Sequence, residues 1–224
     1  GAATDRAPRD IGAALRVAGL DCPSTMVLER ELDLAHIEAT LHWVNELGCP
    51  RLVQSSFAIA DDAGAADWQL AFDRIEGLAR RVRAAGLRYV LHTQINLWRP
   101  LGARRPIDLL LERIDPELMQ LDYDPSGTID YGLDPAGPLR ARPDAFYALH
   151  LRDAHTPPEP VFYLAALPLG TGGVDWPALL DAARASAIEY GFLEMEVTEP
   201  AQTFAALDSS RRYLLEGGLL AARP

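Results

Sequence analysis

The stretch Ala148-Leu149-His150 is a short apolar run that ends in a polar residue. Three other runs follow the same pattern: Tyr89-Val90-Leu91-His92, Met119-Gln120-Leu121-Asp122 and Phe192-Leu193-Glu194. Each run is short and apolar enough to be a buried parallel strand. The C-termini of parallel barrel strands converge on one face, where active sites are built. The four polar residues are therefore candidates for a single site.

The segments between these runs have the patterns of helices. In residues 29–47 and 67–85, apolar side chains recur at helical spacing, and Gly48 and Gly86 end the two segments. Other helices are expected at residues 10–18, 107–113, 176–186 and 200–216, with a helical turn within 139–145. Strands that alternate with helices in this way predict a parallel sheet.

Six strands are predicted in this repeat: residues 20–22, residues 51–57, the runs that end at His92 and Asp122, residues 146–152 and residues 192–197. A closed barrel has eight. The predicted fold class is α/β, a (β/α) TIM-type barrel with about six parallel strands that lacks the first strands. No linker divides the chain, so residues 1–224 are expected to form a single domain. Segments 124–138 and 153–175 are expected to be loops at the rim of the site.

The charge balance narrows the classes of function. The formal net charge is -11, and the sequence contains no lysine. Schiff-base chemistry, pyridoxal phosphate anchoring and a P-loop lysine are therefore excluded. A nucleic-acid partner is not expected, because phosphate binding needs clustered cations. Solubility alone also explains an acidic balance.

Cysteine content and hydropathy bear on the compartment. Cys22 and Cys49 are too few for a disulfide framework and form no CxxC pair, which predicts reduced cysteines in a cytoplasmic protein. No apolar run approaches the ~20 residues that cross a bilayer, and no signal peptide is seen, so no membrane partner is expected.

Each strand-end residue also has an ordinary structural interpretation. His150 could hydrogen-bond a neighbouring loop, His92 could be a core histidine with satisfied hydrogen bonds, and Asp122 could be a helix or loop cap. A lone carboxylate at Glu194 would be costly in so apolar a strand, and Glu196 points the same way two residues on. Four such residues at four strand ends favour the functional interpretation, because two imidazoles and two carboxylates make a divalent-metal site.

The order of these motifs resembles a known family. Residues 149–153 read Leu-His-Leu-Arg-Asp, similar to the family's His-Leu-Lys-Asp, and residues 169–176 match its Leu-Gly-x-Gly-x-x-Asp-Trp. Leu121-Asp122, the Glu194 strand and the closing Arg211-Arg212-Tyr213-Leu214 also fit. From about Ile11 to Leu215, the chain resembles the xylose isomerase-like TIM barrels, the sugar phosphate isomerase/epimerase group that also includes type-IV-like endonucleases.

The resemblance implies a metal site. Asp122, His150 and Glu194 would hold a divalent cation, usually Mn, Mg, Zn or Co. The fourth family ligand is commonly a glutamate, at the position where this chain has His92. Some members have His-x-His there, which here reads His92-Thr93-Gln94.

The resemblance also implies a reaction, with one departure. Epimerases of the family move a proton beside a carbonyl with two opposed glutamates, and this chain retains only Glu194 of that pair. Histidine can serve as an acid or base near neutral pH, so Glu194 and His92 are the catalytic candidates. The predicted function is a metal-dependent isomerase, epimerase or dehydratase of a small sugar, keto-sugar or polyol. Alternatives are a metal-assisted hydrolase or lyase, and a non-catalytic member kept as a binding or partner subunit.

A second departure concerns the start of the chain. The family opens with a strand, a helix and another strand before the helix at residues 10–18, and these are not seen here. An open six-strand sheet would expose two edges. We therefore expect a homodimer, or a partner subunit, that covers the open edge of the barrel.

Further residues are candidates for binding the carbohydrate substrate: Arg152, Gln94, His155, Trp98 and Glu196. Arg152 could clamp a hydroxyl, carboxylate or phosphate, or form a salt bridge with Asp153 or another neighbour. Trp98 could stack on a sugar ring or pack the loop after the His92 strand. Gly170, Gly172 and Gly173 could form a phosphate nest, but a tight turn before Trp176 is the preferred interpretation.

Overall fold

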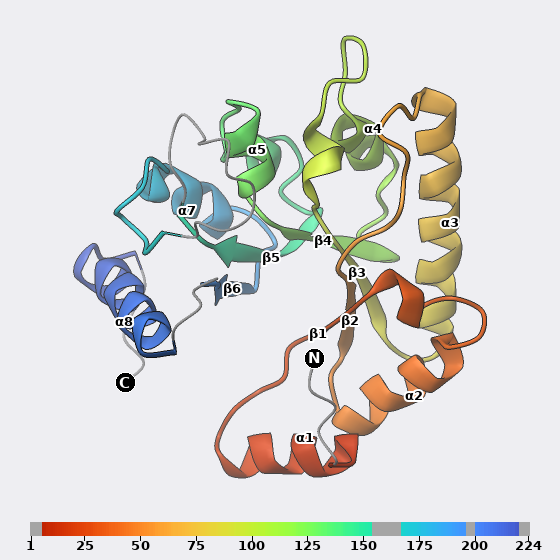
Figure 1. The fold of residues 1–224 in the computed structure, drawn as a ribbon, viewed down its shortest axis with the longest axis horizontal. Coiled ribbons are helices and arrows are strands. Elements are labelled where there is room, and N and C mark those ends of the chain that lie inside the picture. The colour runs from red at the N-terminus through yellow and green to blue at the C-terminus, as the bar shows by residue number, and fades with distance from the viewer. Residues whose placement is uncertain (1–5, 154–166, 196–199, 220–224) are drawn as a thin grey trace. The chain divides into compact units, whose positions relative to one another are not determined.

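The structure is a computed structural model that describes residues 6–153, 167–195 and 200–219 (Figure 1). Within these residues six parallel strands form one sheet, in the order of the chain. The strands are β1 (Thr25–Val27), β2 (Arg51–Gln54), β3 (Arg88–His92), β4 (Met119–Tyr123), β5 (Phe146–Leu151) and β6 (Tyr190–Leu193). Helices alternate with them, which confirms the predicted fold class, a (β/α) TIM-type barrel with six parallel strands.

The helices account for most of the remaining described chain. The α-helices are α1 (Pro8–Val17), α2 (Ile37–Leu47), α3 (Ala65–Ala84), α4 (Pro106–Arg113), α5 (Ser126–Asp130), α6 (Gly137–Ala141), α7 (Trp176–Arg184) and α8 (Pro200–Glu216). The short 3-10 helices are η1 (Glu29–Glu31) and η2 (Ile95–Trp98). The chain divides into two compact units, Gly1–His92 with Glu112–Gln120, and Thr93–Leu111 with Leu121–Pro224. That residues 1–224 form a single domain stays a prediction.

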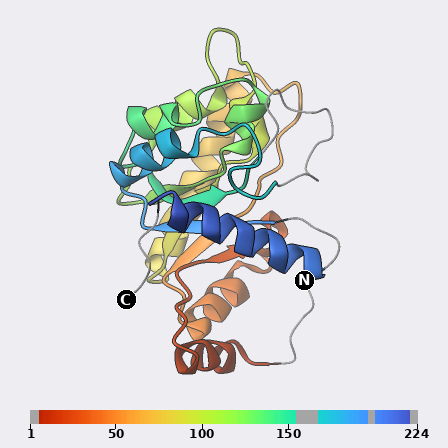
Figure 2. The same cartoon turned by 90° about the vertical axis from the view of Figure 1, so that its left-hand side faces the viewer.

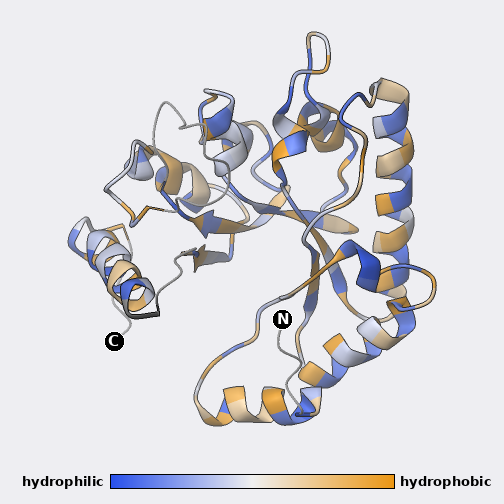
Figure 3. Ribbon diagram, in the orientation of Figure 1, coloured by the Kyte–Doolittle hydropathy of each residue, from blue (hydrophilic) through white to orange (hydrophobic). Residues whose placement is uncertain are grey.

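Helix α3 shows why the first unit folds as it does. Its buried residues are spaced three or four apart, as in an amphipathic helix: Trp68, Ala71, Phe72, Ile75, Ala79 and Val82. Figure 3 shows the resulting alternation of hydrophobic and hydrophilic segments along the helix. The helix begins where the Asp67 carboxylate accepts the Gly64 N–H at 2.9 Å. β2 is buried at every position and pairs with both β1 and β3.

The core of the second unit is built on β5, whose six residues are all buried. The Phe146 ring packs on Tyr123 at 5.3 Å between centroids. Trp176, at the start of α7, is fully buried. Helix α8, which runs as one continuous helix in Figure 2, contributes the Ser210 hydroxyl that accepts the Leu169 N–H at 3.1 Å.

Four local predictions are wrong. The last strand is Tyr190–Leu193 and not residues 192–197. The first strand is Thr25–Val27 and not residues 20–22, because Pro23 has no N–H for a ladder and restricts Cys22. The predicted helix at residues 29–47 begins only at Ile37. Before it, the Asp33 carboxylate accepts the N–H groups of residues 35 and 36, which competes with helix formation. The predicted loop 124–138 contains α5 and the start of α6.

The prediction of reduced cysteines is also wrong. Cys22 and Cys49 form a disulfide, with Cα atoms 5.4 Å apart and a sequence separation of 27. The bond connects the segment before β1 to the segment before β2. The spacing of the two cysteines in the sequence does not predict that these segments are neighbours. Among the described residues, no helix is long and apolar enough to cross a membrane.

Candidate metal centre

The polar residues of the second unit share one face of the sheet. Side chains alternate between faces along a strand, and residues paired across neighbouring strands lie on the same face. Asp122 of β4 pairs with Ala148 of β5, and His150 pairs with Phe192 of β6. Glu194 follows Phe192 by two residues, so Asp122, His150 and Glu194 project from the same face. The sequence prediction that these three residues come together is consistent with this register.

His150 lies between two carboxylates. Its Nε2 atom is 2.9 Å from Asp122 Oδ2, and its Nδ1 atom is 2.6 Å from Glu194 Oε2. The Asp122 side chain is 2% exposed, the His150 side chain 10% and the Glu194 side chain 33%. The cluster is therefore buried at Asp122 and opens toward Glu194.

Electrostatics favour a charged imidazole here. Burial lowers the pKa of His150, but the hydrogen bonds to Asp122 and Glu194 outweigh burial and raise the pKa from 6.5 to about 10. The two carboxylates thus lie on either side of a single positive charge, the His150 imidazolium. A divalent cation bound at this place would interact with the same two carboxylates.

One atom of the cluster tests whether a metal would fit. Asp122 Oδ1 is buried and accepts no hydrogen bond from any described residue. A buried carboxylate oxygen without a partner is costly, because its desolvation is not compensated. Carboxylate oxygens and imidazole nitrogens are ligands of divalent metals. The residues present therefore fit a divalent cation.

Sequence reasoning missed Asp124, which lies two residues after Asp122 and is 5% exposed. One of its carboxylate oxygens and a ring nitrogen of His150 lie within 4.8 Å of each other, so Asp124 is a further candidate ligand. Its Oδ1 accepts the Ser126 N–H at 2.8 Å, and its own N–H donates to Thr93 Oγ1 at 2.9 Å. The i, i+2 spacing from Asp122, which puts both on one face, was the signal in the sequence.

Arg152 adds a fixed positive charge to the same group. Its Nη1 atom is 3.5 Å from Asp124 Oδ2 and 3.7 Å from Glu194 Oε1. The side chain is 11% exposed. Of the two interpretations of Arg152, the salt bridge to neighbours is present in the structure, and the clamp on substrate stays a prediction.

Asp153 has a different role, although it lies in the same motif. It is 1% exposed, and its Oδ2 accepts the N–H groups of Gly170 at 2.9 Å and Gly172 at 3.1 Å. Its Oδ1 accepts the Val174 N–H at 3.3 Å. The backbone donors that a phosphate nest would use are thus bound to Asp153, which supports the turn interpretation of this glycine segment.

The remaining predicted residues are His92, Gln94, Trp98, His155 and Glu196. His92 ends β3 and is half-buried, and Gln94 follows it at the start of η2. Trp98 is 2% exposed and packs on Tyr123 at 5.9 Å between ring centroids, so its packing role has support. His155 and Glu196 lie outside the described residues. For all five, a part in the site stays a prediction.

Comparison with known proteins places the chain among proteins of one fold. A family model described as "Xylose isomerase-like TIM barrel" matches residues 10–214. No curated protein matches the chain in sequence.

Three solved structures illustrate the likeness. A sugar phosphate isomerase/epimerase from Parabacteroides distasonis is 18% identical, with a TM-score of 0.76 over 98% of this chain and 79% of that one. IolI protein with a bound zinc atom is 12% identical, with a TM-score of 0.74 over 97% and 84%. The probable 3-DHS dehydratase AsbF from Bacillus anthracis is 13% identical, with a TM-score of 0.72 over 92% and 81%. At these identities the likeness is one of fold.

Proposed function

Because the chain belongs to the xylose isomerase-like TIM barrel family, we propose that it is a divalent-metal-dependent isomerase, epimerase or dehydratase. Its substrate would be a small sugar, keto-sugar or polyol. Two of the similar structures support this range, one described as a sugar phosphate isomerase/epimerase and one as a probable dehydratase. A third carries zinc, which supports the cation.

The observation that carries the proposal is the cluster around His150. Asp122 and Glu194 approach its two ring nitrogens at 2.9 and 2.6 Å, and Asp122 Oδ1 has no partner among the described residues. Asp122, His150 and Glu194 would hold the cation. His92, at the end of β3, is proposed as the fourth ligand from its place in the motif order.

When bound, the cation would polarise a substrate carbonyl and orient adjacent oxygens. Glu194, the most exposed carboxylate of the cluster, would take a proton from the carbon next to that carbonyl. In an isomerisation or epimerisation a proton would then be returned to carbon, and His92 is proposed to donate it. Arg152, between Asp124 and Glu194, would hold an oxygen of the substrate. Gln94, Trp98, His155 and Glu196 are proposed to contact the substrate.

Metal content is the first test. Purified wild-type protein incubated with Mn²⁺ and desalted should retain about one equivalent by mass spectrometry, whereas His150→Ala and Glu194→Ala should retain little. His42→Ala and Glu46→Gln are matched controls, because both residues are exposed on α2. Stoichiometric metal in both cluster variants would remove the ligand assignment.

Exchange of carbon-bound hydrogen is the second test. In D₂O, the metal-loaded enzyme should wash deuterium into a keto-sugar next to its carbonyl, and Glu194→Gln should reduce the rate by about 10²–10⁴. Bound metal with no exchange on any keto-sugar tested would instead favour metal-assisted hydrolysis or lysis. Absence of both would favour a non-catalytic member.

A partner for the open sheet is proposed as well. β1 and β6 are the ends of the strand order in the described chain, so each has one edge without a neighbouring strand there. We expect a homodimer or a partner subunit to cover an edge. Light scattering after size exclusion should give a mass above that of one 24.5 kDa chain. Location in the cytoplasm stays a prediction. The Cys22–Cys49 disulfide does not favour it, because disulfides are more common in oxidising compartments.

A further inference from the structure

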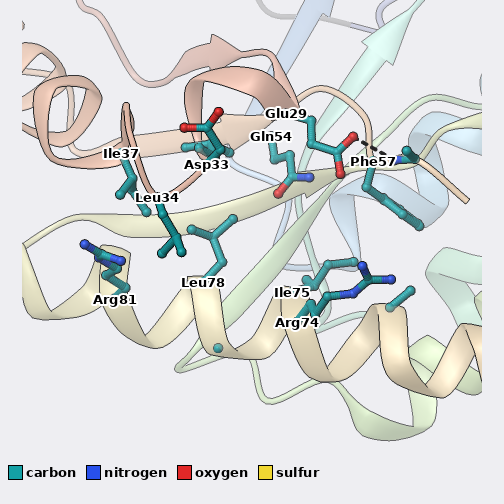
Figure 4. A pocket seen from close by; sticks show the side chains of 14 residues that line it. Glu29, Asp33, Leu34, Ile37, Gln54, Phe57, Arg74, Ile75, Leu78 and Arg81 are labelled. Carbon is teal, nitrogen blue, oxygen red and sulfur yellow. Dashed lines mark hydrogen bonds between the residues drawn. The ribbon is translucent and has the colours of Figure 1, made fainter.

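A cavity of about 610 Å³ lies in the first unit, between the segment that follows β1 and helix α3 (Figure 4). Its walls are largely apolar and include Leu32, Ile37, Phe57, Ile75 and Leu78. The volume falls within the range of about 300–1,000 Å³ that is usual for small-molecule sites. None of its lining residues belongs to the cluster around His150.

Some of the charged side chains that line the cavity have hydrogen-bond partners in the protein, and one has none among the described residues. Glu29 Oε2 accepts the Ala58 N–H at 2.8 Å, and Asp33 Oδ1 accepts the N–H groups before α2. Arg81 donates to Glu38 at 2.6 Å. No hydrogen bond or ion pair joins Arg74 to any described residue. Of the two arginines that line the cavity, the exposed Arg74 is thus the one without a hydrogen bond or ion pair to the described residues, and a guanidinium binds carboxylates in a bidentate manner.

The placement of Arg74 suits an elongated anion. Figure 4 shows Arg74, Ile75, Leu78 and Arg81 on α3, across the cavity from Glu29 and Gln54. The cation therefore lies on the wall opposite Glu29, next to the apolar floor. A ligand with a single anionic end and an apolar body could pair with Arg74 and pack against the apolar residues at the same time.

Gly77 is a second and independent observation. It lies inside α3, where glycine destabilises a helix relative to alanine, and it lines the cavity. Packing does not require a glycine there, because a Cβ atom built on it meets nothing within 4 Å. Its backbone is not in the left-handed region either. Gly77 is exposed and lines the cavity, so the missing side chain leaves the mouth of the cavity open to a ligand.

We propose that this cavity binds a small amphiphilic anion of the medium-chain monocarboxylate class. The carboxylate pairs with Arg74, and the apolar chain lies along Phe57, Ile75 and Leu78, past Gly77. The proposal does not depend on the metal centre or on its reaction, so either can fail without the other.

Isothermal titration of the full chain with octanoate, octan-1-ol and octylammonium tests it. Octanoate should bind at least about tenfold more tightly than the alcohol, and octylammonium should bind least. Arg74→Gln should weaken octanoate about tenfold and leave the alcohol unchanged. Arg80→Gln is the matched control, since Arg80 is exposed on the same helix and only 3.6 Å from Glu76.

Variants at Gly77 locate the ligand. Gly77→Phe should abolish binding of both octanoate and octan-1-ol while circular dichroism shows an intact fold. Gly77→Ala should raise the melting temperature by about 2–4 °C, as expected for a helix glycine that packing does not require. Equal affinity for acid and alcohol, unchanged binding in Arg74→Gln or in Gly77→Phe, or no octanoate binding at millimolar concentration would each overturn the proposal. So would a dimer that buries the cavity and dissociates in Gly77→Phe.

Discussion

Replacing Asp153 with alanine should lower the free energy of unfolding by about 3–5 kcal/mol. The side chain is 1% exposed, and its carboxylate accepts three backbone N–H groups at 2.9, 3.1 and 3.3 Å. A hydrogen bond to a charged acceptor contributes about 1.5–3 kcal/mol. The two shorter bonds share one oxygen and the third is long, so each bond is expected to contribute no more than the lower limit of that range. The three contributions together then come to about 3–5 kcal/mol.

Two further variants grade the effect. Asp153→Asn keeps one oxygen for Gly170 and Gly172 but turns an amide toward the Val174 N–H, and should cost about 1–2 kcal/mol. Asp175→Ala is the control in the same segment. Asp175 is an exposed N-cap that accepts one N–H, from Ala178 at 3.0 Å, and its loss should cost about 1 kcal/mol.

Urea unfolding at pH 7, followed by circular dichroism and by tryptophan fluorescence, measures all three. The expected order of destabilisation is Asp153→Ala, then Asp153→Asn, then Asp175→Ala. The reasoning is refuted if Asp153→Ala costs less than about 1 kcal/mol, or if the amide variant is as unstable as the alanine variant. In either case the carboxylate would not be what holds the glycine segment.

Three further predictions follow from other parts of the fold. In metal-free protein the His150 imidazole should stay protonated in NMR titrations well above pH 6.5, because its pKa is raised to about 10. The stabilisation of the fold that comes with this raised pKa is fully present below pH 6.5 and is lost as the pH rises through about 10. A ring that titrates near 6.5 would contradict the pairing. Cys49→Ser should cost about 3–4 kcal/mol in urea unfolding, because the disulfide to Cys22 closes a loop of 27 residues; no change on adding reductant to the wild type would argue against the bond. Gly127→Ala should cost about 1–3 kcal/mol, since its Cβ would lie 2.1 Å from the buried Trp98 ring, and unchanged stability would mean that this contact is absent.

Elements with strong periodicity could be predicted from the sequence. α3, α4, α7 and α8 lie within two residues of the predicted helices, because their apolar spacing and flanking glycines or prolines are local signals. β5 was recognisable because its apolar run is buried on both faces. Where a side chain competes with the backbone, as Asp33 does before α2, periodicity alone gave the wrong helix start.

Long-range contacts were harder to predict. The Cys22–Cys49 bond depends on how the segment before β1 lies beside the segment before β2, and nothing in the spacing of the two cysteines encodes that. Counting cysteines therefore favoured the reduced form. The contacts of Arg152 with Asp124 and Glu194 likewise depend on strand register, including the irregularity between Leu121 and Asp122.

Three aspartates show how burial and hydrogen bonding separate roles that the sequence leaves alike. Asp122, Asp124 and Asp153 each lie at or just beyond a strand end and are at most 5% exposed. Asp153 directs its carboxylate to three backbone N–H groups, which explains it without a ligand. Asp124 divides its carboxylate between the Ser126 N–H and the Arg152 guanidinium.

Asp122 differs from both. One of its oxygens faces His150, and the other is buried without a partner among the described residues. An uncompensated buried oxygen is unfavourable for the fold alone, so it is best explained by a group that the chain binds. Of the three aspartates, Asp122 is therefore the one whose replacement by asparagine should reduce metal retention most.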